Sequence, residues 1–208
     1  MANGDSGGSF CVFVVEDDDD MREAIRTLLE MCGHQVRAYP NGIALLADLS
    51  RSHAGCIVMD VRMPEVDGLA FQRRLTEAAI ALPVIMISGY ADVALSVKAM
   101  RQGAFTFLTK PFRDQDLLDA VSDAMHNERA AHPRRIEGLA ARAAFDELTP
   151  REQQIMTEMT HGEPNKLIAA RLGLSEAMVK VIRAGIMRKM RAASLPALTR
   201  LAERHGLC

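Results

Sequence analysis

The 208-residue sequence has no tryptophan and two tyrosines, and aromatic residues make up 4% of it. Hydrophobic residues still account for 49% and charged residues for 25%. That balance is typical of packed globular domains and argues against a mainly disordered chain. The length allows one large domain or two small ones.

Long hydrophobic runs are missing as well. No apolar run reaches the ~18 residues of a membrane-spanning helix. Residues 1–9 have neither the basic start nor the apolar centre of a signal peptide. The sequence therefore predicts a cytoplasmic protein with no membrane partner.

Cysteine and histidine are few and scattered. No pair has CxxC or HxxxH spacing, so a structural metal site made of these residues is not expected. We expect reduced thiols; a disulfide between Cys11 and Cys56 is the alternative. The residues concerned are Cys11, Cys32, Cys56, Cys208, His34, His53, His126, His132, His161 and His205.

The net charge of −2 hides an asymmetry. Residues 1–125 contain 11 basic and 18 acidic residues, which gives a net charge of −7. Residues 126–208 contain 14 basic and 9 acidic residues, which gives a net charge of +5. An acidic part joined to a basic part indicates two domains with different partners. The basic part suits nucleic acid, although an ordinary solvated surface gives the same balance.

The first part of the chain alternates apolar runs with amphipathic stretches. The continuous apolar runs are typical of strands buried on both faces. Five such units predict an α/β domain with a doubly wound, flavodoxin-like parallel sheet in the order 2-1-3-4-5, covered by helices on both sides. The expected strands are 10–15, 35–39, 56–59, 83–87 and 105–108.

The last part of the chain is helical in pattern. Thr149, Pro150 and Glu152 form a helix start with a capping box. Further helices are expected over 165–172, over 175–190 and from Ser194 onward, which together make a four-helix domain containing a helix-turn-helix. We predict domains at 9–126 and 148–208, joined by a polar linker over 127–147 that Pro133 interrupts.

Polar residues follow the predicted strands, where chemistry sits in an open parallel sheet. The acidic run 16–20 follows the first strand, Asp60 the third, Ser88 the fourth and Lys110 the fifth. Carboxylates could hold Mg²⁺, and Asp60 could attack phosphorus while Lys110 and Ser88 bind the phosphoryl oxygens.

Each of these residues also has an ordinary structural explanation. Asp18, Asp19 and Asp20 lie where a helix begins, and acids there stabilise the helix dipole. Asp60 and Ser88 could be turn residues, and Lys110 could be a surface lysine. Their joint placement at four strand ends favours a site.

In their order and spacing these residues resemble the receiver domain of bacterial two-component response regulators. The resemblance covers about 115 residues. It is carried by Val14-Val15-Glu16-Asp17, Asp60-Val61-Arg62-Met63-Pro64 with Asp67-Gly68, Ile87-Ser88-Gly89, and Phe107-Leu108-Thr109-Lys110-Pro111-Phe112.

The resemblance implies a role for each matched residue. Asp60 is the implied phosphoacceptor, Lys110 the implied phosphate-binding lysine, and Ser88 and Phe107 the implied switch residues. The implied magnesium ligands are Glu16, Asp17, Asp60 and the main-chain carbonyl of Arg62. A cis Lys110–Pro111 bond is also implied. Glu16 stands where a first Asp is commoner, and Glu65 where Gly is frequent.

The predicted helix over 175–190 has two faces. At ~100° per residue, Val179, Ile182 and Ile186 point to one side, and a basic and small apolar set points to the other. Such a face suits a DNA major groove, although it could equally be a solvated helix surface. The second set is Lys180, Ala184, Met187, Arg188 and Arg191, with Val181 at its margin.

This region resembles a LuxR-type DNA-binding domain, and the whole chain resembles FixJ-like members of the NarL/FixJ response regulators. The resemblance implies that Lys180, Val181 and Ala184 face bases, with Lys166 and Arg188 nearer the DNA backbone. We add Arg183 and Met187 to the predicted DNA-binding set. The matching stretches are 148–152, 165–169, 172–175, 179–181 and 186–190.

Three departures from that family's pattern affect the helical domain. Ile182 stands where a polar or aromatic residue is usual, Gly185 where Asn is common, and Pro164 where Ser is usual. A helical Gly costs ~1 kcal/mol relative to Ala. These departures lower the expected strength of DNA binding.

The sequence therefore predicts a transcriptional response regulator that is not an enzyme. A sensor histidine kinase would phosphorylate Asp60 with Mg²⁺, and the chain would then form a homodimer and bind double-stranded promoter DNA. An alternative is a receiver-controlled protein-interaction regulator with weak or no DNA binding. A magnesium phosphatase that uses Asp17 and Asp19 is a third reading, which leaves Asp60 unexplained.

Overall fold

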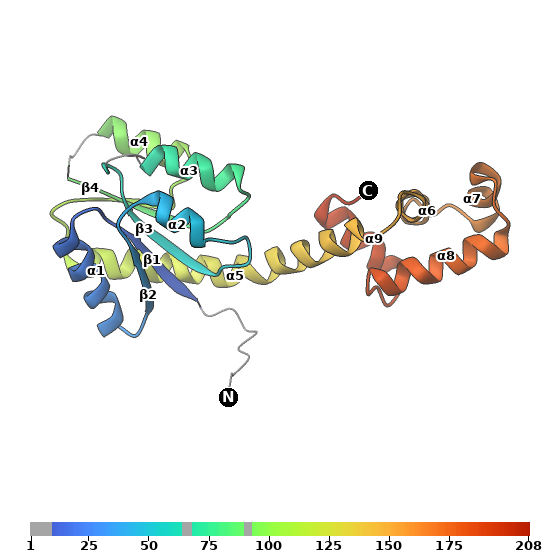
Figure 1. Cartoon of the computed structure of the whole chain (residues 1–208), viewed down its shortest axis with the longest axis horizontal. Coiled ribbons are helices and arrows are strands. Elements are labelled where there is room, and N and C mark those ends of the chain that lie inside the picture. The colour runs from blue at the N-terminus through green and yellow to red at the C-terminus, as the bar shows by residue number, and fades with distance from the viewer. Residues whose placement is uncertain (1–9, 64–67, 90–92) are drawn as a thin grey trace. The chain divides into compact units, whose positions relative to one another are not determined.

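The computed structural model describes residues 10–63, 68–89 and 93–208. The chain divides into two compact units, which we treat separately: the first unit ends at Pro133, and the second runs from Arg134 to Cys208. Figure 1 shows the elements of both. Among the described helices, none is long and apolar enough to cross a membrane.

The first unit contains a five-stranded parallel sheet in the order β2-β1-β3-β4-β5. This confirms the predicted α/β class and strand order. The predicted strands lie within one residue of the observed ends. The strands are β1 (Cys11–Val15), β2 (Gln35–Tyr39), β3 (Gly55–Asp60), β4 (Val84–Ser88) and β5 (Thr106–Thr109).

Helices cover both faces of this sheet (Figure 1). On one face, Val12, Val58 and Ile85 pack with residues of α1 and α5. On the other, Phe13, Met59 and Met86 pack with residues of α2, α3 and α4. Burial on both faces explains why the central strands are continuously apolar. The helices are α1 (Asp19–Met31), α2 (Gly42–Asp48), α3 (Gly68–Glu77), α4 (Val93–Arg101) and α5 (Asp114–Asp146).

The segment predicted as a linker is helical in the structure. Helix α5 continues through Pro133 to Asp146. Ala141 and Phe145, near its end, are buried in the core of the second unit. The polar composition of residues 127–147, from which a linker was predicted, is therefore compatible with a solvated helix surface. The domain boundaries stay predictions.

The second unit is helical, as predicted. Thr149 caps the first helix with a full capping box involving Glu152, and Ser175 and Ser194 cap the third and fourth helices, as predicted. Gly173 ends α7 in the left-handed conformation, which makes the turn to α8. The helices are α6 (Pro150–Thr160), α7 (Asn165–Leu172), α8 (Glu176–Lys189) and α9 (Leu195–His205).

The core of the second unit takes one face of α8. Val179 and Ile186 are fully buried, and Ile182 is partly buried against the same cluster. The prediction that Ile182 lies on the core side is confirmed. Cys11, Cys32, Cys56 and Cys208 are all free thiols, as expected.

Two glycines of the second unit test the cost of helical glycine. A Cβ at Gly185 in α8 would meet nothing within 4 Å, and the same holds at Gly173, where φ is +65°. We expect Gly185→Ala to raise the free energy of unfolding by ~1 kcal/mol, because it removes backbone freedom from the unfolded chain without a clash.

Gly173→Ala is the matched control. It has the same open space but a left-handed backbone, so it should lower the free energy of unfolding by about 1 kcal/mol. Urea unfolding followed by circular dichroism measures both. Equal signs for the two variants would contradict this account.

Candidate functional site

Three carboxylates converge where β1 and β3 end. Glu16 and Asp17 follow β1, and Asp60 is the last residue of β3. One carboxylate oxygen of each lies within 4.8 Å of the others. Because the two strands are parallel neighbours, residues 44 positions apart in the sequence meet at one sheet edge.

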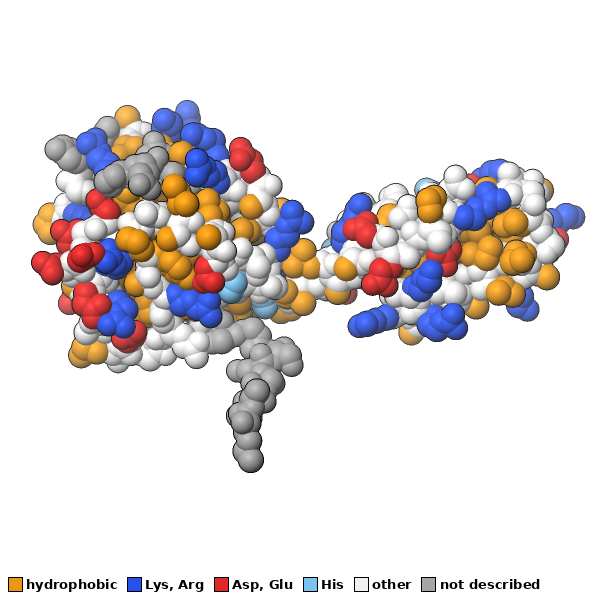
Figure 2. Space-filling model, viewed as in Figure 1, with side chains coloured by type: hydrophobic (Ala, Val, Ile, Leu, Met, Phe, Trp, Pro, Cys, Tyr) orange, Lys and Arg blue, Asp and Glu red, His pale blue; other side chains and the backbone are white. Residues whose placement is uncertain are grey.

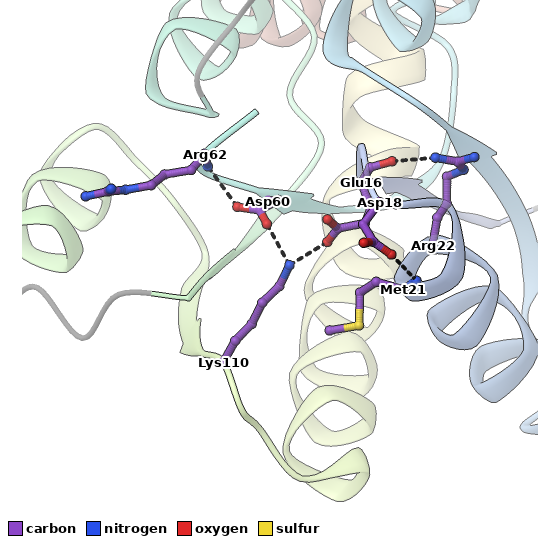
Figure 3. Close-up of polar contacts among 7 residues, drawn as sticks. All are labelled: Glu16, Asp18, Met21, Arg22, Asp60, Arg62 and Lys110. Carbon is purple, nitrogen blue, oxygen red and sulfur yellow. Dashed lines mark hydrogen bonds and ion pairs between the residues drawn. The ribbon is translucent and has the colours of Figure 1, made fainter. Parts of the chain in front are cut away.

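Lys110 joins the cluster from the end of β5 (Figure 3). Its Nζ donates to Asp60 Oδ2 at 2.6 Å and to Glu16 Oε2 at 2.7 Å. The Lys110–Pro111 bond is cis, as the resemblance implied. Partial burial works to lower the pKa of Lys110, but the bonds to Asp60 and Glu16 outweigh it and raise that pKa. The ammonium is therefore held charged between the two carboxylates.

Burial distinguishes the three acids. Glu16 is 2% exposed and Asp60 is 7% exposed, whereas Asp17 is exposed. Desolvation raises the pKa of Glu16, and the bond from Lys110 partly opposes that effect. Asp60 keeps a fixed orientation because the backbone N–H of Arg62 donates to its Oδ1 at 2.8 Å. The Arg62 side chain points away from the cluster (Figure 3).

The remaining acids of the first-strand run have structural roles. Asp18 caps α1 by accepting a hydrogen bond from the Met21 N–H at 2.8 Å. Asp19 pairs with Arg22 on the helix surface, and Asp20 lies in the first turn. The capping explanation therefore applies to Asp18, and the carboxylate cluster draws on Glu16 and Asp17.

Arg22 is a residue that the sequence reasoning missed. Its Nη1 donates to the main-chain carbonyl of Glu16 at 2.8 Å, and so fixes the backbone that carries the first acid (Figure 3). A basic residue two positions after the acidic run was the available signal, but it also fits an ordinary helix ion pair.

The two predicted switch residues occupy the neighbouring strands. Ser88 is fully buried at the end of β4, where its carbonyl accepts from the Lys110 N–H at 2.7 Å. Phe107 lies in β5 opposite Met86 and is partly buried against the core. Both therefore lie on strands that lead directly to the cluster. Pro64, Glu65 and Asp67 of the matched motif lie outside the described residues.

The predicted DNA-binding residues fall into two groups. Lys166 on α7 and the α8 residues Lys180, Val181, Ala184 and Arg188 are exposed. Arg183 and Met187 are only partly exposed, because they lie at the edges of the buried face of α8. Arg183 donates to the Glu163 carbonyl at 3.5 Å, and Met187 packs against the core.

Family models match both units. Residues 12–122 match the response regulator receiver domain, and residues 146–202 match the LuxR family of bacterial regulatory proteins. Together with the acidic cluster and the helix-turn-helix, these matches define a two-domain response regulator.

Similarity to individual proteins extends over nearly the whole chain. Nodulation protein W of Bradyrhizobium diazoefficiens is 41% identical, over 94% of this chain and 86% of its own length. The transcriptional regulatory protein FixJ of the same species is 38% identical, over 94% of this chain and 96% of its own length. The solved structure of the response regulator StyR is 36% identical, with a TM-score of 0.73 over 95% of this chain and 100% of its own.

The chain thus belongs to the FixJ-like two-component response regulators, which are phosphorylation-dependent transcriptional regulators. This confirms the class inferred from the sequence motifs.

Lys110 should be essential to the stability of the carboxylate cluster when no metal is bound. Lys110→Met leaves the nearly buried Glu16 and Asp60 without their counter-charge. We expect the free energy of unfolding in metal-free buffer at pH 7 to fall by about 2 kcal/mol, less than for a fully buried pair because Lys110 is partly exposed.

The deficit should shrink below neutral pH. Burial raises the pKa of Glu16 in the folded protein, so protonation on acidification favours the folded variant. Lys98→Met on the exposed surface of α4 is the control, with an expected change within about 0.5 kcal/mol. A similar loss in both variants would rule out a special role for Lys110.

Proposed function

We propose that phosphorylation of Asp60 controls DNA binding by the second unit. The observation that carries this proposal is the hydrogen bonding of the Lys110 ammonium to both Asp60 and Glu16. In this arrangement one nearly buried carboxylate is held in place by Lys110 and by the Arg62 N–H, beside further acids that can take up a cation.

The proposed reaction is transfer from a phosphohistidine of a sensor kinase. An Asp60 carboxylate oxygen attacks phosphorus, an O–P bond forms, and the N–P bond of the donor breaks as the imidazole leaves with its electron pair. Lys110 moves its hydrogen bond to a phosphoryl oxygen. The product is an acyl phosphate at the sheet edge.

The donor set suits Mg²⁺, which prefers carboxylate and carbonyl oxygens. Glu16, Asp17 and Asp60 supply convergent oxygens, and we assign the main-chain carbonyl of Arg62 as a further ligand. When bound, magnesium would offset the charge of the incoming phosphoryl group. Arg22 supports this set by fixing the Glu16 backbone.

The added charge of about −2 is the proposed trigger. Ser88 lies at the end of β4 beside Lys110, so its hydroxyl can turn toward a phosphoryl oxygen. Phe107 then moves further into the space against the core. The surface of α4 and β5 rearranges and forms a homodimer, which presents two α8 helices to paired DNA half-sites.

Two other functions remain to be tested against this one. A magnesium phosphatase would need Asp17 as its nucleophile, but Asp17 is exposed and Asp60 has the Lys110 contact. A protein-interaction regulator would use the same receiver, but its α8 would bind protein in place of DNA. The DNA-binding experiment below separates this last possibility.

Asp60→Asn should abolish phosphorylation, because an amide cannot form the acyl phosphate. The full-length protein is incubated with acetyl phosphate and Mg²⁺, and the mass gain of one phosphoryl group is followed by mass spectrometry. Asp19→Asn, an exposed acid on α1, is the control and should keep the gain. An unchanged gain in Asp60→Asn would refute the assignment, and a chelator should suppress the wild-type reaction.

Phosphorylation should increase selective binding to genomic DNA fragments at roughly 0.15 M salt. Binding should weaken steeply with salt, because phosphate contacts release counterions. Lys166→Ala on the exposed surface of α7 should reduce the salt slope by about 1, whereas Arg26→Ala on α1 should leave it unchanged. No enrichment in either phosphorylation state would favour the protein-interaction function.

A further inference from the structure

Four of the eight exposed residues of α8 are apolar, and they gather toward one side of the helix. At ~100° per residue, Ala177, Val181, Ala184 and Arg188 lie within about 60° of one another, opposite the buried Val179 and Ile186. Met178 and Gly185 flank this line on one side, and Lys180 flanks it on the other. Only the last turn and one edge therefore carry hydrogen-bonding side chains.

The exposure of this face is large for hydrophobic residues. Val181 is 68% exposed, Met178 51%, and Leu167 on the neighbouring α7 49%. These are three of the seven large hydrophobic residues that are exposed in the described part of the chain. Figure 2 shows hydrophobic side chains at the surface where Figure 1 places α7 and α8. Hydrophobic side chains that are exposed as a group indicate a binding surface, whereas singly scattered ones are common on any protein.

The start of α8 is capped by a side chain. Ser175 Oγ accepts a hydrogen bond from the Met178 N–H at 3.2 Å, which fixes the first helical turn. Residues of the first turns of a recognition helix are the ones that reach base edges. Met178 therefore lies where a base contact forms, one turn before Val181.

The surrounding charge identifies duplex DNA as the occupant of this face. Arg188 on α8 and Lys166 on α7 are exposed beside it, and they can contact DNA phosphates. An apolar protein groove would leave these cations without partners. Gly185 adds open space, since a Cβ there would meet nothing within 4 Å.

We propose that this face recognises thymine by its C5-methyl group, and that Met178 is a specificity-determining residue. The thymine methyl is the one apolar group that distinguishes a base pair in the major groove. Alanine, valine and methionine side chains can contact it, and none of them donates a hydrogen bond to a base edge. The inference rests on the proposed DNA binding and predicts half-sites rich in A·T pairs under the first turns of α8.

The test replaces thymine by uracil, which removes only the methyl group. A site is selected from random duplex DNA with phosphorylated full-length protein, and each thymine is then replaced in turn. We expect one or more positions to weaken binding about threefold to tenfold, which is the effect of losing one buried methyl contact. Fluorescence anisotropy at fixed salt measures the change.

Met178→Gln locates the contact. On thymine-containing DNA, Met178→Gln should bind about as weakly as the wild-type protein binds the uracil-substituted site. At one thymine position, replacement by uracil should then cause no further loss of affinity in Met178→Gln. Met31→Gln is the matched control, because Met31 is an exposed methionine (82%) on α1 of the first unit. It should keep the full thymine–uracil difference, and both variants should keep the wild-type melting temperature.

The outcomes separate this inference from the proposed function. Specific, salt-dependent binding that is insensitive to uracil at every position overturns thymine recognition and leaves DNA binding intact. A full thymine–uracil difference at every position in Met178→Gln overturns the role of Met178. No DNA binding in any state contradicts both the proposed function and this inference.

Discussion

All five strands of the first unit run in the same direction, and this constraint determines where its chemistry can lie. The carboxyl ends of β1, β3, β4 and β5 share one sheet edge. Glu16, Asp60 and Lys110 are therefore brought within hydrogen-bond distance although up to 94 positions separate them. The buried apolar strands supply the stability that allows this edge to carry opposing charges.

Those charges are balanced only in part. One ammonium contacts two nearly buried carboxylates while a third lies within 4.8 Å of them. In the proposed reaction, a cation held by these acids would offset the remaining negative charge, and Lys110 would bind the incoming phosphoryl group. The site is thus sensitive to charge, which is what a phosphorylation switch requires.

In the second unit, one side of α8 packs in the core and the other is exposed. The buried side of α8 holds the helix-turn-helix together, and Lys189 Nζ ties its end to Glu152 of α6 at 2.7 Å. Glu152 is also part of the capping box of α6. With α8 fixed from one side, its exposed side is free to combine methyl-bearing side chains with flanking cations. In the proposed DNA complex, the flanking cations would position α8 in the major groove, and the apolar side chains would contact the bases.

The sequence by itself determined the sheet, its order and the helix starts. Apolar runs buried on both faces leave a distinct pattern, and Thr149, Ser175 and Ser194 cap helices through contacts only three residues away. Tertiary structure decided the rest, because it depends on which atoms meet in space. It placed Arg22 against the Glu16 carbonyl and Arg183 beside Glu163. It also continued α5 through Pro133 to Asp146, and Ala141 and Phe145 near its end are buried in the second core.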